Sequence, residues 1–286
     1  MVQFAPSLVP VEAPLLAPPT ISLLSSASVT DLPERELSGI TYLPEGGVPT
    51  LMPLLDNVSV GDTPITPGTP DEWQGFGIVA SAELSTFNST AAYDAVARAT
   101  RALKAHESRL IEQQLWYDPL GTGNPTLDIG VTNVTPGGSC KPNDFLAYLE
   151  QAAADEPWPG QFFIHVRPYL LNRMHDYVLG TGAIRRDGNR FLTAMDNVVV
   201  PGAGYRASGP RSPGDDIGDA QINLASYDWV MTTPPITVKR SKIQTFGTDR
   251  EIIDRTTNTR KVYVMRQYLA WFDTTHARFA ISVDHA

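Results

Sequence analysis

The alternation of apolar and polar positions predicts one long helix over residues 88–116, with Asn88 at its cap and 89–116 in its turns. Good helix formers fill this stretch, and neither Pro nor Gly occurs in it. Apolar residues recur at spacings of three, four and seven, which predicts a narrow, alanine-rich stripe that packs onto a sheet. The members of this stripe are Val96, Ala99, Leu103, Leu110 and Gln114.

Charged residues occupy the other sides of the predicted helix, where water or a neighbouring subunit would meet them. They include Arg98, Arg101, Glu107, Arg109 and Glu112. At 1.5 Å per residue the helix spans about 40 Å, which is longer than a compact domain of this size requires. The length therefore indicates that another molecule contacts the helix.

The chain before this helix is extended and dense in turn residues. Residues 1–33 hold six prolines and few large apolar residues, which predicts an extended arm without a core of its own. In 34–86, two extended stretches at 37–43 and 73–83 flank a middle rich in Pro and Gly, which predicts a two-stranded flap. An isolated hairpin is marginal in water, so we expect the flap to lean on a partner.

After the helix, the pattern predicts a mixture of helices and strands, hence an α+β fold. Helices are expected at 142–154 and 168–177, and a mobile, charged loop at 206–219. Strands are expected at 161–166, 197–200, 229–240 and 251–256, and a closing pair at 261–268 and 278–283 around a bend at 273–275.

Composition narrows the class of protein. The chain has 286 residues and a mass of 31.2 kDa, enough for one large domain or two modest ones. No apolar run is long enough to span a membrane, and no signal peptide is recognisable. The net charge of −9 argues against a broad electrostatic grip on nucleic acid. Cys140 is the single cysteine, which excludes an internal disulfide and indicates a small buried or loop residue.

Candidate groups for chemistry are few, and structural roles fit them better. His165 and His175, and likewise Asp273 and His276, lack a further metal ligand. The Gly-x-Gly pairs at 121–123, 180–182 and 202–204 lack the remaining residues of a nucleotide loop, so they predict turns.

The acidic loop with Asp215, Asp216 and Asp219 lacks the ligand pattern of a calcium cage. No Gly-x-Ser-x-Gly elbow is present either. We therefore predict no catalytic, cofactor-binding or metal-binding residue. Trp73 and Phe76 lie on a flap with little core of its own, which makes them candidates for an interface.

Four stretches carry a resemblance to a known family: 5–24, 76–116 with its ending Glu-Gln-Gln-Leu-Trp, 198–205, and the tail from Trp229 through Arg266, Trp271, Phe272 and Ala280. Together with the order of the parts, they resemble the major capsid protein of tailed bacteriophages, which has the Hong Kong 97-type capsid fold. The likeness spans essentially the whole chain and is greatest to the capsid proteins of phages of actinobacteria.

The resemblance implies a division of the chain. Residues 1–33 would be an N-terminal arm and 34–86 an extended loop, each lying over a neighbouring subunit. Residues 87–140 and 229–286 would form a peripheral domain with a spine helix at 89–116, and 141–228 an axial domain. The subunit-interface candidates are Trp73, Phe76, Arg98, Arg101, Arg109, Glu112, Arg206, Arg211, Asp215 and Asp216.

Two differences from some members of the family change what we expect for the cross-linking and the scaffolding of the shell. Covalent chain mail uses a lysine of the extended loop, whereas 34–86 contains no lysine, so we expect a shell without cross-links. Met1 stands directly at the arm, so we expect a separate scaffolding protein in place of a cleaved N-terminal region.

The resemblance therefore implies a structural protein that is not an enzyme and has no cofactor. It would self-assemble into pentamers and hexamers of an icosahedral phage head in the host bacterial cytoplasm. Its partners would be further copies of itself, a scaffolding protein, a portal and possible decoration proteins. It would enclose double-stranded DNA without specific binding and would not contact a membrane. Alternatives are an encapsulin-like compartment, another virion protein of the tail or decoration type, and a hydrolase with a flap.

Overall fold

The computed structural model of the chain describes residues 19–42, 71–85, 95–156, 160–173, 183–206, 209–211, 227–246, 253–254 and 259–284. Several predicted features lie outside these ranges. They are the arm before residue 19, the flap between 43 and 70, the helix start with Asn88, His175, and most of the 206–219 loop with Asp215, Asp216 and Asp219.

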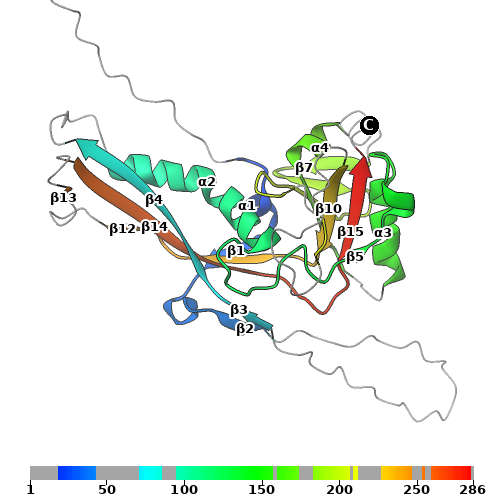
Figure 1. The fold of residues 1–286 in the computed structure, drawn as a ribbon, viewed down its shortest axis with the longest axis horizontal. Helices are drawn as coiled ribbons and strands as arrows, with labels where there is room; N and C mark the ends of the chain where they lie inside the picture. The colour runs from blue at the N-terminus through cyan, green and yellow to red at the C-terminus, as the bar shows by residue number, and fades with distance from the viewer. Residues whose placement is uncertain are drawn as a thin grey trace, which may run out of the picture.

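A long antiparallel ribbon with a helix along it forms one half of the molecule (Figure 1). Its strands are β4 (Phe76–Ser85) and β14 (Thr259–Trp271), which pair from Phe76 with Tyr268 to Ser85 with Thr259. Helix α2 (Ala95–Tyr117) packs on both strands. Four short strands complete the sheet at β14 or beside it: β1 (Ser28–Asp31), β11 (Thr237–Arg240), β12 (Gln244–Phe246) and β13 (Ile253–Asp254).

The sequence of β4 explains why the helix lies on one face of this ribbon. Phe76, Ile78 and Ala82 are buried, whereas Gly77 and Val79 between them are exposed. Because successive side chains of a strand point to opposite faces, the buried set faces α2. The matching side of α2 carries small or medium side chains, so helix and ribbon can approach closely.

A second, seven-stranded sheet forms the other half of the molecule, in the order β5-β15-β10-β6-β9-β8-β7. Its two central strands, β6 and β9, are parallel, and every residue of both is buried. The strands are β5 (Thr132–Asn133), β6 (Phe163–Val166), β7 (Ile184–Asp187), β8 (Arg190–Thr193), β9 (Val198–Pro201), β10 (Tyr227–Thr233) and β15 (Phe279–Asp284).

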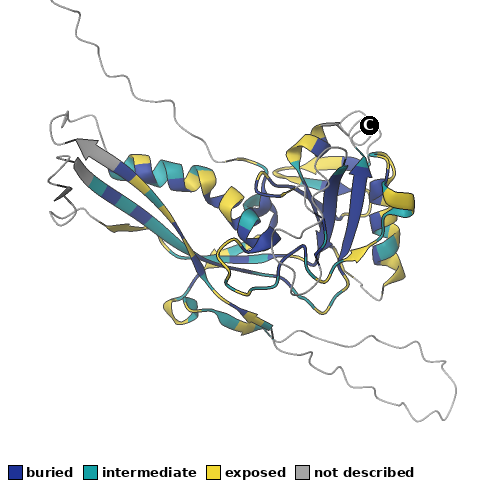
Figure 2. Ribbon diagram, viewed as in Figure 1, coloured by how far each residue is buried: buried dark blue, intermediate teal, exposed yellow. Residues whose placement is uncertain are grey.

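Each face of this second sheet belongs to a different hydrophobic core. One core contains Ile164 and Val199 with residues of helices α3 (Phe145–Asp155) and α4 (Pro168–Arg173). The other contains Val198 and Val200 and continues into the last turns of α2 and the ribbon. Figure 2 shows the burial concentrated in this half, while α2 remains exposed along one side. The end of α2 is therefore the joint between the two sheets.

Short elements near the N-terminus, around the flap and between β5 and α3 complete the described chain. They are α1 (Leu23–Ser26), the 3-10 helices η1 (Glu34–Glu36) and η3 (Pro136–Gly138), and the strand pair β2 (Ile40–Tyr42) and β3 (Asp71–Trp73).

The long helix is confirmed over its described residues and ends one residue later than predicted. Its predicted stripe is partly wrong, because Leu110 is exposed and Ile111 and Leu115 are buried in its place. Helix α3 begins at Phe145, three residues after the predicted start. The strands predicted at 161–166 and 197–200 correspond to β6 and β9, whereas β12 and the β7–β8 hairpin were not predicted.

Three predicted arrangements are wrong at least in part. The two stretches of the flap pair with each other at β2 and β3, as predicted, whereas β4, which holds most of the second stretch, pairs with β14. The two strands predicted as a closing pair do not pair with each other, because β14 and β15 lie in different sheets. The arm's final part is not separate either, because Leu23, Ala27 and Leu32 are buried and β1 pairs with β11. The region 229–240, predicted to be extended, contains the end of β10 and all of β11, with Pro234 between them.

The break between β3 and β4 at Gly75 yields a test of this arrangement. A Cβ at Gly75 would lie 2.7 Å from the backbone oxygen of Leu37, whereas one at Gly77 would meet nothing closer than Met265 Sδ at 3.8 Å. We expect Gly75→Ala to lower the free energy of unfolding by about 1–3 kcal/mol, measured by urea denaturation. Gly77→Ala is the matched control. Equal stability of the two variants would contradict the close approach of the strand break to Leu37.

Candidate subunit interface

Helix α2 turns its carboxylates inward and its cations outward. Within α2, Glu107 and Glu112 are both buried, whereas Arg98, Lys104 and Arg109 are exposed and Arg101 is half-exposed. The sequence predicted all the charged positions of the helix to be on the surface. The glutamates are therefore a correction, and their partners explain why they are buried.

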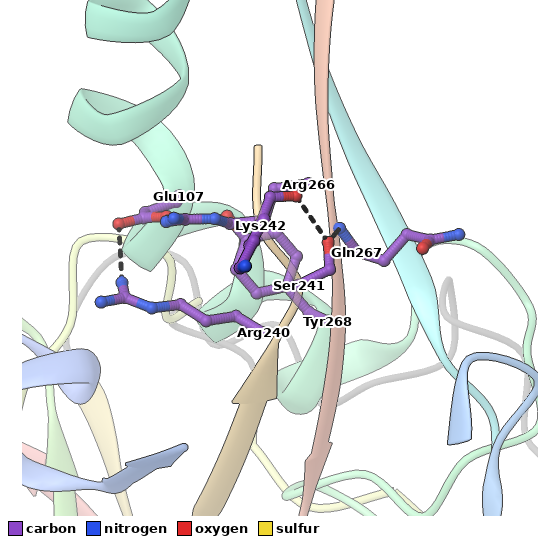
Figure 3. A network of polar contacts seen from close by, with 7 residues as sticks. All are labelled: Glu107, Arg240, Ser241, Lys242, Arg266, Gln267 and Tyr268. Atoms are coloured by element: carbon purple, nitrogen blue, oxygen red, sulfur yellow. Dashed lines mark hydrogen bonds and ion pairs between the residues drawn. The ribbon is translucent and has the colours of Figure 1, made fainter. Parts of the chain in front are cut away.

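Glu107 lies at the centre of a polar network between α2 and the ribbon (Figure 3). Its carboxylate accepts hydrogen bonds from Tyr268 Oη at 2.7 Å, Arg266 Nη1 at 3.0 Å and Arg240 Nη1 at 3.3 Å. Burial, followed by the hydrogen bond to Glu107, raises the pKa of Tyr268, so the phenol keeps its proton and donates it. The network fixes α2 against β11 and β14.

Glu112 joins three segments that are distant in the sequence. One oxygen accepts from Leu23 N at 3.2 Å and from Ser108 Oγ at 2.9 Å, and the other accepts from Gly204 N at 2.9 Å. The turn at Gly204 can lie against the helix because it lacks a side chain: a Cβ there would be 2.2 Å from the backbone oxygen of Arg109. Burial raises the pKa of Glu112, and these hydrogen bonds oppose the rise.

Four predicted interface residues are buried inside the chain. Trp73 packs edge-on against Phe272, and Phe76 stacks on Tyr268. The third is Glu112.

Arg211 is the fourth, and it binds the buried Asp128 through Nε at 2.6 Å and Nη2 at 3.0 Å. Salt bridges of this kind need full pairing, because an unpaired buried charge is costly. Each of these four residues is at most 8% exposed, so it can offer little surface to a neighbouring subunit. We therefore base the proposed interface on the accessible candidates and not on Trp73, Phe76, Glu112 and Arg211.

The remaining described candidates are accessible. Arg98, Arg101 and Arg109 lie along α2, and Arg206 lies over the ring of Tyr117 at 3.6 Å from its centroid. Asp215 and Asp216 lie outside the described residues. The accessible surface of α2 is therefore cationic, in a chain whose net charge is negative.

The groups weighed as chemical candidates have structural partners. His165 is buried between Tyr205 Oη and Thr233 Oγ1, each 2.8 Å from a ring nitrogen, and burial lowers its pKa to about 3. Its predicted structural role is confirmed. Cys140 is buried, as predicted, and burial raises its pKa to about 11.

Among the described residues, no three His, Cys, Asp or Glu side chains are placed to hold a metal ion. No helix in the same ranges is long and apolar enough to cross a membrane.

Comparison with known proteins places this geometry in context. No protein-family model and no curated protein sequence matches the chain. Solved structures do match along nearly its whole length. A chain of Microbacterium phage Oxtober96 covers 99% of this chain and 96% of its own, with a TM-score of 0.53 and 10% identity.

Two further matches are assemblies of other kinds. The capsid of the native GTA particle covers 100% of this chain and 95% of its own, with a TM-score of 0.55 and 13% identity. The holo-SrpI encapsulin complex from Synechococcus elongatus PCC 7942 covers 96% and 92%, with a TM-score of 0.55 and 10% identity. The chain has the Hong Kong 97-type capsid fold.

In this Hong Kong 97-type fold, the predicted spine helix is α2, and its supports are polar as well as apolar. Sequence reasoning missed Glu107, Tyr268 and Asp128 as structural residues. A signal for Glu107 was present, because it lies four residues after Leu103 and therefore on the same side of the helix. No local pattern indicated its partners, since Tyr268 is more than one hundred residues away in the chain.

The Glu107 network yields a stability prediction. Glu107→Ala leaves Arg266 largely buried without its partner, so we expect a loss of about 3 kcal/mol in the free energy of unfolding. Tyr268→Phe removes one hydrogen bond and should cost about 1–2 kcal/mol. The exposed Glu34 provides the control, Glu34→Ala. Urea denaturation measures all three, and a loss at Glu107 no larger than at Glu34 would refute the network's role.

Glu112 should make stability depend on pH in a defined direction. Its folded-state pKa lies above the ordinary 4.5, so its contribution is fully present below that pH and is lost as pH rises through the folded pKa. Glu112→Gln cannot ionise and lacks this loss. We expect the stability of the wild type relative to Glu112→Gln to fall as pH rises above 4.5, measured by urea denaturation. An advantage that grows with pH would contradict burial of the ionised carboxylate.

Proposed function

We propose that this chain is a structural subunit that self-assembles into the pentamers and hexamers of an icosahedral phage head. The observation that carries the proposal is the whole-chain match in fold to phage and GTA capsid chains. The head would enclose double-stranded DNA and would assemble in the host cytoplasm with a scaffolding protein and a portal. Shell building is geometric, so the subunit needs contacts between copies and no catalytic group.

One open edge of the ribbon supports contact with another copy. Strand β4 lies at the edge of its sheet, and among the described residues no strand pairs with its outer side. Its ten residues contain neither Pro nor Lys, the residues that commonly protect such an edge. Val79 at this edge is 56% exposed and lines a groove with Leu110 and Gln113 of α2. A neighbouring subunit would cover this edge in a shell.

Contacts of this kind can be weak individually, because a closed shell repeats each of them many times. The absence of lysine from 34–86 supports a shell held by non-covalent contacts, since the covalent cross-link implied by the resemblance needs a lysine there.

An encapsulin-like compartment is the second candidate. The match to the Synechococcus encapsulin has the same TM-score as the match to the native GTA capsid, and it supports this candidate. In both cases the chain would form a closed shell. The two differ in what the shell contains: packaged double-stranded DNA or a cargo protein.

Electron microscopy of the purified full-length chain, expressed with and without phage partners, tests the proposal. We expect closed icosahedral particles whose subunits run as one band near 31.2 kDa on denaturing gels. Val79→Lys should lower the particle yield severalfold, because it puts a charge at the open edge. Met195→Lys, at a position that is 71% exposed, is the matched control. A monodisperse wild-type monomer would overturn the shell, and a ladder of linked subunits would overturn non-covalent assembly.

A further inference from the structure

The base of the flap is a small sheet of its own, formed by β2 and β3 (Figure 1). Among the described residues, it pairs with no strand of the two larger sheets. Tyr42 and Asp71 lie opposite each other at its outer end, where the flap continues, and Ile40 and Trp73 lie opposite each other at its inner end. We call these two strands the flap base. Side-chain contacts have to fix its direction, because no continuous sheet does so.

Trp73 fixes one point of the flap base. Its buried indole packs edge-on against Phe272, with 5.1 Å between the ring centroids. Glycines lie at both inner ends of the base, and a Cβ at Gly39 would be 2.4 Å from the backbone oxygen of Trp73. Apolar packing is not directional. This contact therefore holds the base in place and leaves it free to turn about that point.

Asn124 holds the inner end of the flap base through two hydrogen bonds. Its Oδ1 accepts from Gln74 N at 2.6 Å, and its Nδ2 donates to Gln74 O at 2.9 Å. Asn124 lies in a loop that is fixed to the end of α2. Within this loop Asp118 accepts hydrogen bonds from Thr122 Oγ1 at 3.0 Å and from Gly123 N at 2.8 Å. The paired contact restricts the angle of the backbone at Gln74 as well as its position.

The bend between β14 and β15 holds the outer end of the flap base. Thr274 Oγ1 donates to the carboxylate of Asp71, and Tyr42 Oη donates to Asp273 Oδ2 at 3.3 Å. Gln74 and Asp71 are three residues apart, so the inner and outer holds are about 10 Å apart along the strand. Two directional contacts at this separation prevent the rotation that the single apolar contact would permit.

The inner hold contributes direction more than stability. Gln74 is exposed and Asn124 is half-buried, so water can replace the hydrogen bonds between them. Both holds come from segments at the joint between the two larger sheets. One is the loop after α2, and the other is the bend that leads from the six-stranded to the seven-stranded sheet. The flap base therefore takes its direction from the place where the two halves of the molecule meet.

We propose that Asn124 and Thr274 are positioning residues, which fix the direction in which the flap leaves the subunit and thereby the spacing of neighbouring subunits. The effect on assembly rests on the proposed function. The flap at 43–70 lies outside the described residues, and its direction is set at the base. A closed shell of one size requires the same geometry at every repeated contact. Loss of the two holds therefore yields shells of mixed size.

Double electron–electron resonance on unassembled full-length subunits tests the direction of the flap base without a shell. Nitroxide labels on Glu72→Cys and Lys104→Cys report the distance between the flap base and α2. Both positions are exposed, whereas Cys140 is buried and stays unlabelled in the folded chain. The width of the distance distribution measures how far the base can turn.

The test variant is Asn124→Ala, Thr274→Val, and its matched control is Asn133→Ala, Thr275→Val. The control residues are of the same types, and their side chains form hydrogen bonds within their own turns. We expect the distance distribution of the test variant to be about twofold broader than that of the wild type, because the base turns about a single contact. The control should keep the wild-type width. Equal widths for test and control variants would overturn the proposal.

Urea denaturation separates a loss of direction from a loss of folding. The midpoints of the test and control variants should agree, and a large fall in the test variant alone would overturn the proposal. Asn124→Asp provides a second comparison, because it keeps the oxygen that accepts from Gln74 N and loses the donor to Gln74 O. Its distance distribution should be narrower than that of Asn124→Ala, and equal breadth would contradict the inner hold.

Electron microscopy of the same variants tests the effect on assembly. The control should form particles of the wild-type diameter, and the test variant should form them in about threefold lower yield, with other sizes in their place. Particles of one diameter and of wild-type yield from the test variant would overturn the role in the shell. Failure of the wild type to form particles would instead refute the proposed function, and the resonance measurement would still decide whether the two holds fix the flap base.

Discussion

Two buried carboxylates on one helix hold the parts of this molecule in place. Glu107 connects α2 to β11 and β14 of the six-stranded sheet. Glu112 connects the same helix to the segment at Leu23 and to the turn after β9 of the seven-stranded sheet. A buried charge is tolerated only when it is paired or fully hydrogen-bonded, so each carboxylate restricts the helix to a position where its partners meet it.

The inward direction of these acids determines what the outer side of the helix can do. With Glu107 and Glu112 engaged inside, the exposed charges of α2 are cationic. The open edge of β4 lies along the same half of the molecule, which extends away from the seven-stranded sheet (Figure 1). The exposed side of α2 and the open edge of β4 are surfaces that no other part of the same chain covers among the described residues. Under the proposed function, contacts with other copies would cover these surfaces.

Local patterns predicted the helix and several strands because their periodicity is set by neighbouring residues. Val198 to Val200 form a continuous apolar run, and such a run predicts a buried strand in any context. Local patterns do not determine which strands pair with each other. Strand β4 finds its partner β14 far along the chain, and β15 joins a different sheet from β14, although only a short bend separates them. These choices depend on long-range packing, which a pattern of period two does not encode.

The residues of the candidate interface likewise divide into those whose exposure a local pattern predicts and those whose burial depends on distant parts of the chain. The exposure of Arg98 and Arg109 followed from the helical period, and the structure confirms it. Trp73 was predicted to be an interface candidate because a two-stranded flap has little core of its own, and Glu112 because an acid on a helix usually lies on the surface. Their partners, Phe272 and Gly204, come from elements that no local signal connects with them. Burial of these two residues is a property of the folded chain and not of their own segments.

The most direct measurement is a cryo-electron microscopy reconstruction of particles formed by the wild-type chain, at a resolution that shows side chains. Our account predicts closed icosahedral shells, with Glu107 and Glu112 engaged within each subunit. A monomer that forms no particles, or particles with either glutamate bound to a neighbouring subunit, would contradict it.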